Sequence, residues 1–355
     1  MVGRESLLAG AACAFLLFAA ASGCAGTPGA PPPAPPAAPP GESAASVTVA
    51  PASPHPAPAL RKVQLAVPAK SFVFLPYYFG QHLGLYAEQG IDLDIAVVQP
   101  STAIAATVAG EVQYNAASGS TLGAALAGAP LRNVMFVMVD LIFSLYAQPE
   151  VRTVAELAGG TVAVTNRYAT DDYALAAILR HYGVPDDRVT RVTAGTAANS
   201  FTALTSRGVT GAILSPPYSE LAERQGFTFL EYAANMLKRS QSGLATTVQR
   251  IEQQPDEVKR MIRATLASIR AVQDRRDEAT AFAMQLFELD TELAAAGVQK
   301  AAQALARDGK MPADVLDAEA ADIAAAQHLS GPVRGSQFVD YRLLDEVLRE
   351  PAVVR

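Results

Sequence analysis

Predicted strands and helices alternate from residue 62 onward. Alternating apolar and polar residues predict strands at 62–69 and 91–99, and a continuous apolar run predicts another at 131–140. The segment STAIAATVAG at 101–110 predicts a helix whose N-cap is Ser101. A strand–helix succession of this kind predicts an α/β fold with a parallel or mixed sheet covered by helices.

The same succession starts again in the second half of the chain. VAELAGGTVAVT at 154–165 predicts a short helix and a strand, and TDDYALAAILRHYGV at 170–184 predicts an amphipathic helix. The segments at 105–120 and 201–217 share one plan, in which a helix, a glycine, an apolar strand and a serine follow one another. We therefore expect two lobes of similar build, followed after residue 250 by a helical region.

The first sixty residues predict an export signal followed by a tether. Arg4 precedes the apolar stretch LLAGAACAFLLFAAA, and small residues lead directly to Cys24. We interpret residues 1–23 as a lipoprotein signal peptide and Cys24 as the lipidated residue; an ordinary cleaved signal with an incidental cysteine is the alternative. Residues 24–60 are rich in proline and alanine and predict an extended tether between lipid and domain.

The composition argues against several classes of protein. A net charge of −6 is unsuited to wrapping nucleic acid, which normally needs a basic surface. The two cysteines, Cys13 and Cys24, both lie within the first 24 residues, and no two of the four histidines have the spacing of a helical zinc motif. The sequence also lacks a phosphate-binding loop and a nucleophile elbow, so we expect no metal, no cofactor and no enzyme activity.

Several segments, in order, resemble one family of transport proteins. They are GLYAEQGIDLDI at 84–95, AGEVQYNAASGSTLGAALAGAPLRNV at 109–134, VAELAGGTVAVT at 154–165, YALAAILRHYGV at 173–184, SPPY at 215–218 and QFVDYRLLDEVL at 337–348. The chain resembles the ABC-transporter substrate-binding proteins for sulfonates, taurine, nitrate and thiamine precursors, the NMT1/THI5-like family. Gln113 and Thr210 stand where family members usually have aspartate.

This resemblance implies a two-lobed type II periplasmic binding fold. Together with the strand–helix pattern, it predicts a first lobe from residues 61–142 and 248–355, which includes the C-terminal helices. The second lobe is expected at 147–244. Two crossovers, at Val139–Ala147 and Leu244–Val248, are expected to act as the hinge.

Ligands of open α/β sheets bind beyond the carboxyl ends of strands, where helix N-termini offer free N–H groups. Four turns of this chain meet that description, and by resemblance they match the family's cleft. We therefore predict a ligand-binding set of Lys70, Ser71, Phe72, Ser118, Gly119, Ser120, Arg167, Tyr168, Thr170, Ser215 and Tyr218.

Each candidate also has a purely structural interpretation. Lys70 fits a solvated surface charge, Ser120 fits a helix cap, and Phe72 fits the core. Arg167 is placed to give an anionic ligand a charge-assisted hydrogen bond. The neighbouring Asp171 and Asp172 are interpreted as first-turn charges that the helix dipole favours.

These features predict an exported, lipid-anchored and monomeric solute-binding protein. Its partners would be a small-molecule ligand and the permease and ATPase of an ABC importer, with no nucleic acid. We expect the ligand to be a small organic anion, such as a sulfonate or carboxylate, or an aromatic or heterocyclic compound. The alternatives are a pyrimidine-precursor enzyme on the same fold and a ligand-sensing lipoprotein without a transport role.

Overall fold

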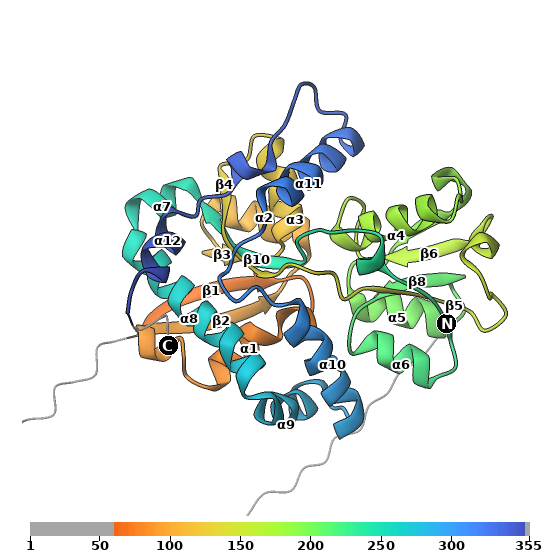
Figure 1. Cartoon of the computed structure of the whole chain (residues 1–355), viewed down its shortest axis with the longest axis horizontal. Coiled ribbons are helices and arrows are strands. Elements are labelled where there is room, and N and C mark those ends of the chain that lie inside the picture. The colour runs from red at the N-terminus through yellow and green to blue at the C-terminus, as the bar shows by residue number, and fades with distance from the viewer. Residues whose placement is uncertain (1–59, 352–355) are drawn as a thin grey trace, which may run out of the picture. The chain divides into compact units, whose positions relative to one another are not determined.

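The structure, a computed structural model, describes residues 60–351 of the 355-residue chain. The expected signal peptide, the lipidation site Cys24 and all of the tether except its last residue lie outside the described residues. Two five-stranded sheets organise the described part (Figure 1). No helix in this part is both long and apolar enough to cross a membrane.

The first sheet has the strand order β2-β1-β3-β10-β4. Its strands are β1 (Arg61–Val67), β2 (Ile91–Val97), β3 (Tyr114–Asn115), β4 (Leu131–Met138) and β10 (Ser242–Thr247). β1 runs parallel to β2 and β3, whereas β10 runs antiparallel to β3 and β4. One strand from a distant part of the sequence is thus inserted into an otherwise parallel sheet.

The second sheet repeats this plan with the order β7-β6-β8-β5-β9. Its strands are β5 (Ser144–Ala147), β6 (Thr161–Val164), β7 (Thr190–Thr193), β8 (Gly211–Leu214) and β9 (Thr228–Tyr232). β6 runs parallel to β7 and β8, and β5 runs antiparallel to β8 and β9. The expected α/β fold with two similar lobes is confirmed, and we call the sheets with their helices the first and second lobe.

The chain passes between the lobes twice, through residues 139–143 and residues 233–241. The second passage comes earlier than the expected crossover at Leu244–Val248, because β10 pairs with β4 along its whole length. Residues 242–244 therefore lie in the first lobe and not at the end of the second. Apart from Leu244, β10 consists of small residues. A Cβ added to Gly243 would lie 2.7 Å from the Met135 carbonyl oxygen, so the close approach of the two backbones favours glycine at this position.

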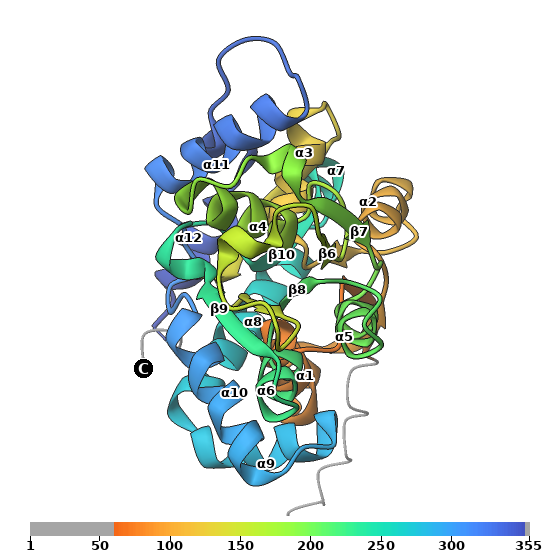
Figure 2. The same cartoon turned by 90° about the vertical axis from the view of Figure 1, so that its right-hand side faces the viewer.

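Helices cover both sheets. In the first lobe they are α1 (Leu75–His82), α2 (Pro100–Ala109) and α3 (Ser118–Leu126), and in the second α4 (Thr170–His181), α5 (Ala197–Thr205) and α6 (Tyr218–Arg224). The C-terminal helical region comprises α7 (Val248–Gln253), α8 (Pro255–Asp274), α9 (Arg276–Phe287), α10 (Thr291–Ala304), α11 (Ala313–Ala326) and α12 (Arg342–Leu348). α8 packs on α1 and α11 packs on α3, so this region extends the first lobe. Viewed from the side of the second lobe, α11 lies at one end of the molecule and α9 and α10 at the other (Figure 2).

Local sequence sets several element boundaries. Gly90 adopts φ 71° before β2, a left-handed conformation that glycine reaches without a Cβ penalty. Pro100 occupies the first turn of α2, where its missing N–H costs nothing, and Gln99 is the N-cap. Ser101 is therefore a helical residue and not the expected N-cap.

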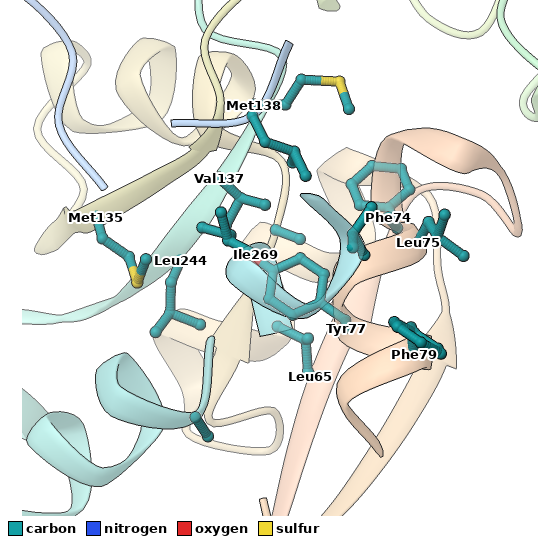
Figure 3. Packing of buried hydrophobic residues seen from close by; sticks show 14 of the residues in the cluster. Leu65, Phe74, Leu75, Tyr77, Phe79, Met135, Val137, Met138, Leu244 and Ile269 are labelled. Atoms are coloured by element: carbon teal, nitrogen blue, oxygen red, sulfur yellow. The ribbon is translucent and has the colours of Figure 1, made fainter. Parts of the chain in front are cut away.

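The main core lies between the first sheet, α1 and α8. Leu65, Val137, Leu244 and Ile269 meet there with no exposed surface (Figure 3). Burial of each such side chain contributes roughly 1.5–3 kcal/mol. Tyr77 of α1 is also buried, and its hydroxyl donates to the Gly243 carbonyl over 2.6 Å. These contacts hold α1, and with it the turn between β1 and α1, firmly against the sheet.

Candidate functional site

A small chamber of about 60 Å³ lies between the two lobes. We call it the inner chamber; it is lined by Pro68, Ala69, Ser71, Val73, Phe74, Pro100, Ala117, Ser120, Phe143, Thr165, Ala169, Thr170, Asp171, Ala197, Ser215 and Gln241. Most of these residues follow the carboxyl end of a strand or begin a helix, the place where ligands bind on α/β sheets. Both passages between the lobes contribute, through Phe143 and Gln241.

The lobes touch each other beside this chamber. The Phe72 N–H, in the turn after β1, donates to the Pro216 carbonyl, in the turn after β8, over 3.2 Å. The Lys300 ammonium of α10 also lies 2.8 Å from a carboxylate oxygen of Glu220 on α6. The two lobes are thus in direct contact beside the chamber in this structure.

Among the described residues that line the chamber, Asp171 alone has a carboxylate, and none has a cationic side chain. Its carboxylate accepts hydrogen bonds from the Thr165 N–H at 2.5 Å and the Thr165 hydroxyl at 2.8 Å. Burial raises the pKa of Asp171 to about 6, outweighing the opposing effect of these two bonds. The chamber thus contains a carboxyl group that changes its charge not far below neutral pH.

Gln241 is the second polar group of note. Its side chain is buried, with 4% of the residue exposed, and its Oε1 accepts from the Ile142 N–H over 2.6 Å. Its Nε2 has no hydrogen-bond partner within residues 60–351. A buried amide N–H without a partner costs about 1–3 kcal/mol.

A larger groove of about 290 Å³ adjoins the chamber and shares Pro100, Ser120 and Ala169 with it. This outer groove is also lined by Ser101, Ile104, Gly119, Gly123, Ala124, Ala127, Asn166, Arg167, Tyr168, Ile323 and Gln327. The groove offers a path by which a ligand longer than the chamber can extend outward.

The charge of Arg167 is compensated within the second lobe. Its Nη1 lies 2.9 Å from Asp172 Oδ1, and Arg191 Nε lies 3.0 Å from the same oxygen. Asp172 also accepts from the Tyr168 N–H over 2.9 Å and so holds the turn before α4. An anionic ligand in the inner chamber would therefore not meet an unpaired guanidinium.

A buried ionic cluster lies behind the chamber. Glu319 of α11 accepts from the N–H and the hydroxyl of Ser240, both at 3.1 Å, and Arg239 Nε lies 3.1 Å from its Oε1. The Arg239 guanidinium carbon lies 3.8 Å from the centroid of the Tyr173 ring, a cation–π contact with α4. Residues of the second passage thus join α11 of the first lobe to α4 of the second.

The predicted site residues divide into three groups. Ser71, Ser120, Thr170 and Ser215 line the inner chamber, and Gly119, Ser120, Arg167 and Tyr168 line the outer groove. Lys70, Phe72, Ser118 and Tyr218 line neither cavity. Ligand contact by the first two groups stays a prediction.

The third group lies elsewhere for identifiable reasons. Lys70 is exposed, which avoids the cost of burying its ammonium. The Phe72 ring is in the core, 4.5 Å from the Phe287 centroid, and the buried Ser118 hydroxyl donates to Ser240 Oγ over 3.1 Å. The Tyr218 ring packs 5.6 Å from that of Phe201.

Asp171, Phe143 and Gln241 are among the lining residues that were not predicted as ligand contacts. Asp171 was interpreted as a first-turn charge that the helix dipole favours, although it directly follows the predicted contact Thr170 in the chain. Phe143 and Gln241 lie in the passages between the lobes, which carry no periodic pattern. The sequence signal for them was therefore absent.

A sequence profile of the family described as NMT1/THI5 like matches residues 71–279, more than half of the chain. The chain belongs to the NMT1/THI5-like family. The riboflavin-binding protein RibY of Chloroflexus aurantiacus is 27% identical over 262 residues, covering 69% of this chain and 72% of the relative. The family resemblance inferred from the sequence is thereby confirmed.

Solved structures show the same fold. The alkanesulfonate-binding protein SsuA from Xanthomonas axonopodis pv. citri, bound to MOPS, superposes with a TM-score of 0.69 at 16% identity, covering 81% of this chain and 99% of SsuA. The desulfurization enzyme DSZB superposes with a TM-score of 0.61 at 13% identity, covering 81% and 98%. At these identities the likeness establishes the fold alone. This NMT1/THI5-like chain has the fold of periplasmic binding proteins.

Proposed function

We propose that this protein is the solute-binding component of an ABC importer, exported from the cytoplasm and anchored by a lipid at Cys24. The observation that carries the proposal is the inner chamber, which both lobes and both passages between them line. A ligand that contacts both lobes binds the closed state better than the open state and shifts the population toward it. A permease can distinguish the closed, loaded protein from the open one.

Two similar proteins support a small organic ligand. The RibY relative is named for riboflavin binding, and the SsuA structure holds MOPS. The hydroxyls of Ser71, Ser120, Thr170 and Ser215 can donate to or accept from such a ligand. We propose Ser71, Ser120, Thr170 and Ser215, together with the groove residues Gly119, Arg167 and Tyr168, as the predicted residues that contact it.

A ligand screen tests the proposal. The mature protein is heated with flavins, pyrimidines, sulfonates, carboxylates and nitrate in turn, and its melting temperature is followed. A ligand at 100 times its Kd stabilises the native state by about 2.7 kcal/mol, which raises the melting temperature measurably. The ligand should be recovered chemically unchanged, as a transport role requires and an enzyme on the same fold would not.

Uptake by intact cells separates transport from sensing. Deleting the gene should abolish uptake of the labelled ligand at concentrations near its Kd, and the intact gene should restore it. Ligand binding with unchanged uptake in the deletion strain would favour the sensing alternative. No stabilisation by any compound, with uptake also unchanged, would contradict a solute-binding role.

A further inference from the structure

Charged side chains of α6 in the second lobe meet opposite charges on α10 of the first lobe (Figure 2). The Lys300 ammonium lies 2.8 Å from Glu220 Oε1, and the Glu220 side chain is only 6% exposed. The other carboxylate oxygen of Glu220 accepts from the Ser219 hydroxyl over 2.7 Å. Glu220 is thus a nearly buried carboxylate paired with a cation of the other lobe, and separation of the lobes would break the pair.

A second ion pair lies farther along the same two helices. Arg224, at the end of α6, pairs with Asp290, and its Nη2 lies 3.8 Å from Glu292 Oε2. Asp290 is the N-cap of α10 and accepts from the Leu293 N–H over 3.0 Å, so its carboxylate is held in place. Asp290 precedes Lys300 by ten residues, which corresponds to about 15 Å along a helix. The contact between the lobes therefore extends along α10.

Both helices adjoin the turns that line the inner chamber. α6 directly follows the turn of Ser215 and Pro216. On α10, Gly297 lies against the Phe72 ring, and a Cβ added to it would lie 2.5 Å from Phe72 Cζ. The Phe72 N–H donates to the Pro216 carbonyl across the lobe boundary, and Ser71 and Ser215 beside this pair line the chamber. The contact of α6 with α10 therefore bears directly on the chamber wall.

We propose that this contact is an interlobe latch, which stabilises the arrangement with the lobes in contact. The latch consists of Glu220, Arg224, Asp290, Glu292 and Lys300. The chain's own charges then set how often the chamber opens, in addition to any effect of a ligand. All of these side chains except Glu220 are at least partly exposed, so salt screens the latch and opening becomes more frequent as the ionic strength rises. The inference goes beyond the proposed function and does not depend on which ligand binds.

The Phe72 amide hydrogen can measure opening, because its acceptor belongs to the other lobe. Exchange of this hydrogen with deuterium requires its hydrogen bond to open, so the exchange rate reports the open population. Mass spectrometry with fragmentation of the labelled peptides follows this amide in the mature protein. The amides of β1 and β6 are bonded within one lobe and should exchange more slowly, because they require unfolding of that lobe.

Variants that remove a cation test the latch. Lys300→Met keeps the aliphatic stem, and we expect the Phe72 amide to exchange roughly threefold faster; with Arg224→Met added, we expect roughly tenfold. Lys300→Arg keeps the charge and should exchange at close to the original rate. Lys310→Met breaks a pair with Asp345 inside the first lobe, at a similar side-chain exposure of 38%, and should leave the exchange of Phe72 unchanged.

Salt gives a second test. Raising NaCl from about 20 mM to about 500 mM should speed exchange of the Phe72 amide in the original protein and in Lys310→Met. It should change exchange little in the double variant, whose latch has no cations.

Three results would overturn the latch. They are equal rates or equal salt responses of the Phe72 amide in the original protein and the double variant, equal effects of Lys300→Met and Lys310→Met, and exchange of the Phe72 amide as slow as that of β1 and β6. None of them alters the outcome of the ligand screen or the uptake assay, so a solute-binding role would stand.

Discussion

Asp171 and Asp172 are adjacent in the first turn of α4, and their carboxylates have different surroundings. Asp172 lies between Arg167 and Arg191, so its negative charge is balanced. Asp171 is equally buried but is held by the uncharged Thr165. The helix dipole favours both charges, yet it is the side chains around each residue that decide how costly its ionisation is.

This difference predicts a pH-dependent stability. The folded pKa of Asp171, raised to about 6 by burial, lies above the ordinary value of 3.8, so the folded state binds the proton more tightly than the unfolded state does. The stabilisation is complete below about pH 4 and is lost as the pH rises through about 6, amounting to roughly 3 kcal/mol. Urea unfolding at pH 4, 5, 6 and 7 measures it.

The variant Asp171→Asn removes this titration. The difference in unfolding free energy between the original protein and Asp171→Asn should therefore change between pH 4 and pH 6. Asp187→Asn, at an exposed position of the same lobe, controls for a general effect of losing a carboxylate. If the unfolding free energies of the original protein and of Asp171→Asn changed in parallel with pH, burial would not raise the pKa of Asp171.

At the scale of elements, α11 is attached to the second passage by the Arg239–Glu319 pair. The Arg239 side chain is 1% exposed and that of Glu319 is 0% exposed. Burial raises the pKa of Glu319, and the charge of Arg239 opposes that rise. A Cβ at Gly119, the second residue of α3, would lie 3.1 Å from Glu319 Oε1, so a larger residue there would require this carboxylate to shift by a few tenths of an ångström.

Breaking this pair should be strongly destabilising. Arg239→Met leaves Glu319 buried without a counter-charge, and we expect a loss of about 3–5 kcal/mol in unfolding free energy. Arg239→Met combined with Glu319→Gln should recover most of that loss. Arg207→Ala breaks an exposed pair with Glu150 and should cost less than about 1 kcal/mol. Equal effects of the two arginine variants in urea unfolding would contradict the argument.

Gln113 and Thr210 occupy equivalent positions in the two lobes. Gln113 Oε1 accepts from the Gln64 N–H of β1 over 2.8 Å, and Thr210 Oγ1 accepts from the Thr161 N–H of β6 over 3.1 Å. Both side chains therefore hold a backbone N–H of the first parallel strand of their own sheet. An acceptor is what this position requires, and glutamine and threonine supply one in place of the expected aspartate.

At the scale of the whole molecule, two chain passages join the lobes, and both line the inner chamber. A movement of one lobe against the other must change the backbone at residues 139–143 and 233–241, where Phe143 and Gln241 lie. Under the proposed function, ligand contact and lobe closure would be coupled through the same segments. This arrangement suits a protein that must signal to a permease that it is loaded.

The proposed lipid anchor is tested on the whole chain. Cys24→Ala removes the only thiol beside the expected cleavage site, so the variant should be released in soluble form or accumulate as the uncleaved precursor. Cell fractionation, immunoblotting and mass spectrometry of the mature N-terminus measure this. Cys13→Ala, inside the signal peptide, should leave membrane attachment unchanged. Normal processing and membrane retention of Cys24→Ala would contradict lipidation.

Local sequence patterns were enough to predict the class of fold. The alternation in β1 and β2, the helical spacing in α4 and α8, and the glycine and proline at element ends arise from residues close together in the chain. The sequence therefore determined two similar α/β lobes with a helical C-terminal region, and the ordered family motifs pointed to the family.

The inner chamber, by contrast, was decided by tertiary packing. Ser71 and Ser120 could be placed because they follow predicted strands, but Phe72 and Ser118 in the same turns are buried among distant residues. β10 joins the first sheet by pairing with β4, and no local sequence pattern predicts this pairing. The Gln241 amide nitrogen has no hydrogen-bond partner in residues 60–351, and burial raises the pKa of Asp171, because segments far apart in sequence exclude water from both side chains. Burial and charge compensation depend on those long-range contacts, and only the folded chain defines them.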